Sequence, residues 1–123
     1  MTRGILGIGV CTLDVLTRVR SFPEKESVEE AESSQLMGGG PVPTALAAAS
    51  KLGAQVAMMD TLGDDWQSET IIDELNRLGI NCDNIIIELG CKASLASVLI
   101  RKSDGARAIR FVKSTANPIP KDL

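Results

Sequence analysis

Short apolar runs alternate with helical patterns along the 123 residues of this chain. Residues 5–10 and 56–59 are continuous apolar runs, which are typical of strands buried in a parallel sheet. Residues 45–53 form an Ala-rich stretch that ends at a glycine, and residues 68–78 repeat their apolar positions at helical spacing. Strands that alternate with helices predict an α/β sheet with right-handed crossovers.

The second half of the chain predicts further strands. Residues 80–89 contain a third apolar run. Residues 94–101 and 107–113 flank an Asp-Gly turn signal at Asp104, and this arrangement predicts a β-hairpin.

Two segments near the N-terminus are less regular. Residues 15–19 can continue the first strand in extended form. The Glu-rich stretch at residues 24–35 leaves two alternatives: a solvated loop or helix face, or an exposed strand that leads to Leu36.

Two stretches between the elements contain turn signals. We expect no regular secondary structure at residues 38–44, because three glycines and two prolines occur within seven residues. Residues 61–65, Thr-Leu-Gly-Asp-Asp, are expected to form a turn in which Asp64 or Asp65 caps the following helix.

The composition narrows the classes of function. The formal net charge is -3 and aromatic residues make up only 2%, so a nucleic-acid partner is not expected. The chain contains no His, which excludes Ser-His-Asp and Cys-His catalytic arrangements built from this chain alone. The three cysteines form no CxxC pair, so we expect no zinc site and reduced thiols in a cytoplasmic protein. No apolar run has the length of a membrane span, so no membrane partner is expected.

The segment Gly7-Ile8-Gly9 begins like the G-x-G-x-x-G fingerprint of dinucleotide-binding sites. Thr12 replaces the third glycine, and residues 17–23 show no amphipathic helix and end at a proline. We therefore disfavour a dinucleotide-binding Rossmann fragment. These glycines are expected to permit close backbone packing at the end of a strand.

Two features indicate a site for a ligand rich in oxygen atoms. Asp14 follows the first predicted strand, and ligands of open α/β sheets bind at the carboxyl ends of the strands. Gly38, Gly39 and Gly40 precede a helix, so a ligand can approach the backbone closely and meet free N–H groups at the helix start. The alternatives are a surface turn residue for Asp14 and a plain flexible loop for the glycines.

The stretch from Gly39 to Gly53, Gly-Gly-Pro-Val-Pro-Thr followed by an Ala-rich helix that ends in Leu-Gly, resembles the first signature region of the ribokinase/PfkB carbohydrate kinases. Further motifs occur in the family's order: Asp14 after the first strand, Leu-Gly-Asp-Asp-Trp at 62–66, Leu-Gly-Ile at 78–80, Ser94, and Asp-Gly-Ala-Arg at 104–107. The resemblance covers essentially the whole chain.

The resemblance implies a ribokinase-like three-layer α/β sandwich with a small β-sheet lid. This chain would be its N-terminal, substrate-binding portion (residues 1–123), with lid strands inserted at roughly residues 15–37 and 94–113. A sugar or nucleoside is implied as substrate, ATP and Mg²⁺ as cofactors, and the lid as a contact through which a homodimer can form. The implied substrate-binding residues are Asp14, Gly38, Gly39, Gly40, Thr44, Ser94 and Ser97.

The sequence departs from the family pattern at three positions. Thr44 stands where the family has Asn, so the choice of sugar is left open. Gln67 and Leu95 each stand where the family has Gly. The family's catalytic Asp and its Gly-Ala-Gly anion hole belong to a later Asp-Thr-x-Gly-Ala-Gly-Asp segment, which this sequence lacks. We therefore expect no catalytic, nucleotide-binding or metal-binding residue in this chain, and no activity from the chain alone. A non-catalytic module that binds a sugar or dimerises is the alternative.

Overall fold

A computed structural model describes residues 3–122 of the chain. In chain order its elements are β1 (Gly4–Ile8), β2 (Thr12–Val19), β3 (Ser33–Gly39), α1 (Pro41–Lys51), β4 (Gln55–Gly63), α2 (Trp66–Arg77), β5 (Ile80–Glu88), β6 (Ser94–Arg101) and β7 (Arg107–Val112). No helix among these residues is long and apolar enough to cross a membrane.

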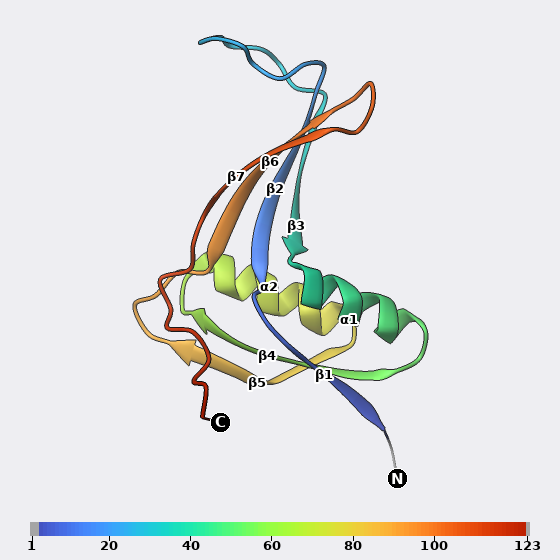
Figure 1. The fold of residues 1–123 in the computed structure, drawn as a ribbon, viewed down its shortest axis with the longest axis vertical. Helices are drawn as coiled ribbons and strands as arrows, with labels where there is room; N and C mark the ends of the chain where they lie inside the picture. Colours follow the sequence, from blue (N-terminus) through green and yellow to red (C-terminus); the bar gives the residue numbers. More distant parts are fainter. Residues whose placement is uncertain (1–2, 123) are drawn as a thin grey trace.

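The first sheet is parallel and has the strand order β1-β4-β5. Both helices lie against the same face of this sheet (Figure 1). Gly7 lets α1 pack directly onto β1, because a Cβ at this position would come within 2.6 Å of Leu46 and Val42. The core between the sheet and the helices includes the fully buried Met58 and Ile71. The predicted α/β class is confirmed.

The second sheet, which we call the projecting sheet, has the order β3-β2-β6-β7 and extends away from the first (Figure 1). β2 pairs antiparallel with β3 and parallel with β6. β6 and β7 form the predicted hairpin, with Gly105 in the turn at a φ of 71°. The extended segment at 15–19 is confirmed, but it belongs to β2 of this sheet and not to β1.

The expectation of no regular structure at residues 38–44 was wrong. Gly38 and Gly39 are the last residues of β3, and α1 begins at Pro41, so only Gly40 lies outside an element. The prolines are tolerated because they occupy the first turn of α1, where backbone N–H groups have no acceptor within the helix. Gly40 connects β3 to α1 at a φ of 106°, which suits glycine.

The expected turn at residues 61–65 was wrong over its first three positions. Thr61, Leu62 and Gly63 continue β4, because they pair with the second half of β5. The turn is confined to Asp64 and Asp65, and Asp65 caps α2 by accepting a hydrogen bond from the N–H of Ser68.

The Glu-rich stretch is a loop for most of its length. Residues 20–32 contain no helix or strand, and β3 begins at Ser33. The loop is held to the projecting sheet at its base, where the N–H of Glu32 donates to the carbonyl of Arg18 and the Glu32 carboxylate lies 3.2 Å from the Lys102 ammonium.

Candidate functional site

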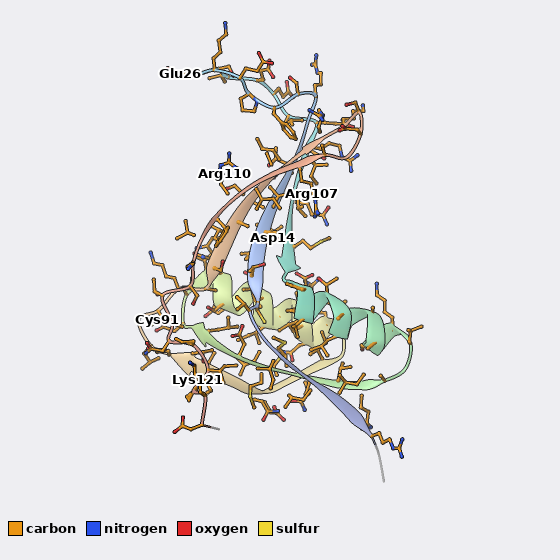
Figure 2. All side chains as sticks on the ribbon, in the orientation of Figure 1. Asp14, Glu26, Cys91, Arg107, Arg110 and Lys121 are labelled. Atoms are coloured by element: carbon orange, nitrogen blue, oxygen red, sulfur yellow. The ribbon has the colours of Figure 1, made fainter. Side chains whose placement is uncertain are left out.

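A cavity of ≈ 690 Å³ lies between the base of the projecting sheet and the carboxyl ends of β1 and β4. Residues 60–62 of β4 line it from the core, and residues 10–12 line it at the crossing from β1 to β2. Residues 113–114 and 116–118, which follow β7, also line it. Figure 2 shows Asp14 at the base of the projecting sheet, above the core. This place agrees with the rule that ligands of open α/β sheets bind at the carboxyl ends of the strands.

Strand register decides which side chains of the projecting sheet reach the cavity. Thr12 pairs with Ser94, and Asp14 pairs with Ala96, so all four share one face. Phe111 of β7 pairs with Ala96 and joins the same face. The cavity wall therefore combines polar groups near the core with apolar groups farther out, at Ala96, Val98, Ile109 and Phe111.

Asp14 is oriented by its neighbours on adjacent strands. The Thr12 hydroxyl donates to Oδ1 of Asp14 at 3.0 Å. Gly39 lies across from both, and a Cβ at this position would overlap the Asp14 carboxylate and the Thr12 hydroxyl. The glycine thus leaves the space that the carboxylate occupies, which brings two of the residues implied by the sequence together.

Ser94 also lies at the cavity and is almost fully buried. Its hydroxyl donates to the carbonyl of Val112 at 3.0 Å, which ties the base of β6 to β7. With its proton engaged in this way, the hydroxyl oxygen can act toward a ligand only as an acceptor.

Of the seven implied residues only Asp14 and Ser94 line the cavity; Gly39 contacts Asp14 from behind, and the other four lie elsewhere. Ser97 pairs with Val15, so it lies on the opposite face of the projecting sheet and is exposed. Thr44 is exposed on α1. The N–H of Gly38 donates to the Glu74 carboxylate, and Gly40 packs against the carbonyl of Val10.

The start of α1 offers fewer donors than the sequence argument assumed. Pro41 and Pro43 have no N–H, and the N–H of Thr44 donates to the carbonyl of Gly40 at 3.1 Å. Among the first four helical residues, Val42 alone keeps a free backbone donor. The start of α1 is therefore a weaker anion site than a helix start without prolines.

Asp60 is a cavity residue that the sequence analysis missed. Its side chain is only 7% exposed, and its carboxylate accepts hydrogen bonds from the N–H groups of Cys11, at 2.7 Å, and Thr61, at 2.8 Å. Burial raises the pKa of Asp60, although these N–H donors act in the opposite direction. Asp60 directly follows the apolar run at 56–59, so the rule that selected Asp14 would also have selected it.

Cys11 is not a nucleophile in this arrangement. Its side chain is buried, and this burial together with the neighbouring Asp60 carboxylate raises the pKa of the thiol far above its ordinary value. The thiol therefore stays protonated at neutral pH. Lys113 and Asn117 also line the cavity, and no local sequence signal marked them, because the chain path after β7 brings them there.

The described residues, 3–122, contain no group of three or more His, Cys, Asp or Glu side chains that could hold a metal ion. We therefore assign no metal ligand within this range.

Comparison with known proteins shows which family and which relatives the chain resembles. A family model described as pfkB family carbohydrate kinase matches residues 3–122. A ribokinase of Bacillus subtilis (strain 168) is 27% identical over 104 residues, which are 85% of this chain and 36% of that protein. A probable fructokinase-5 of Arabidopsis thaliana is 30% identical over 95 residues, which are 75% of this chain and 29% of that protein. The chain thus spans about a third of the length of the curated relatives it matches.

Solved structures with the same fold cover nearly all of the chain. A putative ribokinase from Agrobacterium tumefaciens superposes with a TM-score of 0.85 at 23% identity, over 93% of this chain and 37% of that one. The Arabidopsis thaliana ribokinase, solved with ribose and ATP, superposes with a TM-score of 0.72 at 22% identity, over 91% of this chain and 36% of that one. The ribokinase-like fold expected from the sequence is confirmed as a partial domain.

Proposed function

Because the chain belongs to the pfkB family of carbohydrate kinases, we propose that it forms the substrate-binding part of a kinase that transfers the γ-phosphate of ATP to a hydroxyl of a sugar or nucleoside. The observation that carries this proposal is the position of Asp14, oriented by Thr12, in the cavity between the two sheets. A carboxylate at this place can accept hydrogen bonds from two substrate hydroxyls.

The chemistry of the cavity suits a sugar. Asp14, Ser94 and Asp60 present acceptor oxygens to hydroxyl groups, while the ring of Phe111 offers an apolar surface to the C–H groups of a sugar ring. In this proposal the projecting sheet serves as a lid over the substrate. Gly39 contributes by leaving room for Asp14. Thr44 and Ser97 lie outside the cavity, so we assign them no contact with the substrate.

Phosphoryl transfer needs a catalytic Asp and an anion hole, which the family pattern places in a later segment that is not in this sequence. ATP carries the transferred group, and Mg²⁺ would neutralise charge on its phosphates, so catalysis depends on positioning and electrostatic stabilisation. We assign neither a catalytic base nor a nucleotide site to residues 3–122, and we expect no kinase activity from the 123-residue chain alone. A cytoplasmic location and a homodimer through the projecting sheet belong to the same proposal.

Ligand titration of the chain tests this proposal. D-Ribose and D-fructose are added to the 15N-labelled chain, and amide shifts are followed by NMR. We expect saturable shifts around Asp14 and Ser94 with at least one sugar. The substitution Asp14→Asn is expected to weaken this binding at least about tenfold, because it removes a charged acceptor.

Asp73→Asn is the matched control, because Asp73 is exposed on α2 and lies outside the cavity. Equal loss of binding in both variants would remove Asp14 from the site. In parallel, ATP-dependent phosphorylation of the sugar is assayed with the chain alone. Any turnover would contradict the expected inactivity, whereas binding without turnover is the expected result.

A further inference from the structure

Three backbone amides lie where the projecting sheet meets the core. Each of them donates a hydrogen bond to an acidic side chain of the core. The N–H of Cys11, just before β2, donates to Asp60 on β4 at 2.7 Å. The N–H of Gly38, at the end of β3, donates to Glu74 on α2 at 2.6 Å. The N–H of Ala93, just before β6, donates to Asp65 at the start of α2 at 3.3 Å.

We propose that Asp60, Asp65 and Glu74 are positioning residues that together set the angle of the projecting sheet over the substrate cavity. We call them the three junction carboxylates. The inference deepens the proposed function, since it assigns to these residues the placement of the lid above Asp14.

The two sheets share no strand pairing, so few contacts are available to fix their relative orientation. β1, β4 and β5 pair only with one another, as do β2, β3, β6 and β7, within the described residues 3–122. A hydrogen bond from a backbone N–H to a carboxylate is about twice as strong as one between neutral groups. Three such bonds at three separate crossings constrain both the tilt and the twist of the projecting sheet.

At two of the three junctions the residue that donates the amide is buried, which raises the cost of losing the hydrogen bond. Cys11 and Ala93 are nearly inaccessible, and Leu13 beside them is fully buried. An unpaired amide at such a place costs free energy, so loss of the acceptor should let the junction open locally. The Ala93 junction has a second bond, because the side-chain amide of Gln67 donates to the Ala93 carbonyl at 2.8 Å.

The absence of a side chain at Gly38 allows one of these bonds to form. A Cβ at Gly38 would come within 3.1 Å of the Glu74 carboxylate, so a side chain there would press on its acceptor. Asp60 accepts the hydrogen bond from the Cys11 amide at the crossing from β1 to β2, and Asp60 also lines the cavity. A change of lid angle at this crossing would therefore move the cavity floor and Asp14 relative to each other.

Amide hydrogen exchange of the full 123-residue chain tests the inference site by site. Asp60→Asn places an NH₂ group against one of two amide donors, and Glu74→Ala removes its acceptor. We expect exchange at Cys11 to accelerate at least about tenfold in Asp60→Asn, and exchange at Gly38 likewise in Glu74→Ala. Amides of Met58 and Ile71 in the core should keep their wild-type rates. Asp73→Ala, next to Glu74 on α2 but exposed, is the control and should change neither junction.

Two results would overturn the inference. One is unchanged exchange at Cys11 and Gly38 in the variants, and the other is equal acceleration across the core, which a general loss of stability would produce. If Asp60→Asn does not fold, Glu74→Ala and Glu74→Gln decide alone, with Gln expected to restore part of the protection because it keeps an acceptor oxygen. The outcome does not depend on sugar binding, so failure of the wild-type chain to bind any sugar would count against the proposed function only.

Discussion

Single residues decide the geometry around Asp14. The carboxylate fits only because Gly39 has no side chain, and the Thr12 hydroxyl holds one of its oxygens. Residue choice at position 39 therefore controls the site even though Gly39 itself offers no polar side chain to a ligand.

The substitution Gly39→Ala is expected to displace Asp14 and to destabilise the fold by about 1–3 kcal/mol, since the added methyl overlaps polar atoms in a packed region. Urea unfolding measures the stability, and sugar titration measures the site. Gly4→Ala is the matched control, because a Cβ at this strand position lies at 3.4 Å from its nearest neighbour, which is ordinary contact. Similar losses in both variants would show that any added methyl in a strand is costly, and would contradict the special role of Gly39.

The raised pKa of Asp60, also a single-residue property, predicts that the stability of the fold depends on pH. Its pKa is raised in the folded chain, chiefly by burial, so the folded state binds the proton more tightly than the unfolded state. The free energy of unfolding should therefore rise as pH falls from above the raised pKa toward the ordinary Asp value, about 3.9. Urea unfolding measured from pH 7 down to about pH 4 should show this gain for the wild type relative to Asp60→Asn. A difference between the two proteins that stays constant with pH would refute the buried ionisable role.

At the scale of elements, the β6–β7 hairpin is tied at its tip by side chains. The Arg101 guanidinium makes two hydrogen bonds to the Asp104 carboxylate, at 2.9 and 2.7 Å, and its Cζ atom lies 4.8 Å from the centre of the Phe22 ring. The tip of the hairpin and the loop at 20–32 are thereby connected.

Removal of this contact should be visible in the titration of Asp104. Arg101 and the N–H of Ala106 lower the pKa of Asp104 to about 2. Arg101→Ala should return the pKa most of the way toward its ordinary value, about 3.9, as measured by 13C NMR of the carboxyl group. The lowered pKa of Asp104 adds stability to the wild type at pH values above about 3.9, and this contribution is lost as pH falls toward 2. An unchanged titration midpoint in Arg101→Ala would assign the shift to the turn backbone.

At the scale of the whole molecule, the core sheet has helices on one face only among residues 3–122 (Figure 1). β1 is an edge strand, and its Ile8, which lies on the face opposite α1, is 56% exposed. Ile5, Leu6 and Val10 are exposed in the same region. An open edge with apolar side chains favours self-association.

We expect the 123-residue chain to self-associate with rising concentration and Ile8→Lys to lower the average mass in sedimentation equilibrium. A charge at the edge opposes strand-to-strand pairing. Asn76→Lys adds the same charge to an exposed position on α2 and serves as control. If both variants reduce association equally, net charge and not the β1 edge governs it.

The sequence by itself determined the parts of this protein that depend on local pattern. Apolar runs and helical spacing predicted the α/β class, the Asp-Gly signal predicted the β6–β7 hairpin, and the motif order identified the family. These features were predictable because periodicity and turn chemistry act over a few neighbouring residues. The place of Asp14 beside a cavity followed from a general property of α/β sheets.

Only the tertiary structure decided the features that depend on pairing between distant segments. Gly38 and Gly39 are in a strand because β2 supplies their partners, and Ser97 points away from the cavity because the register of β6 against β2 places it there. Asp60 meets Cys11 across 49 positions of sequence, a contact that no local pattern records. A shift of one residue in register reverses the face of every side chain in a strand, and register is set by packing of the whole sheet.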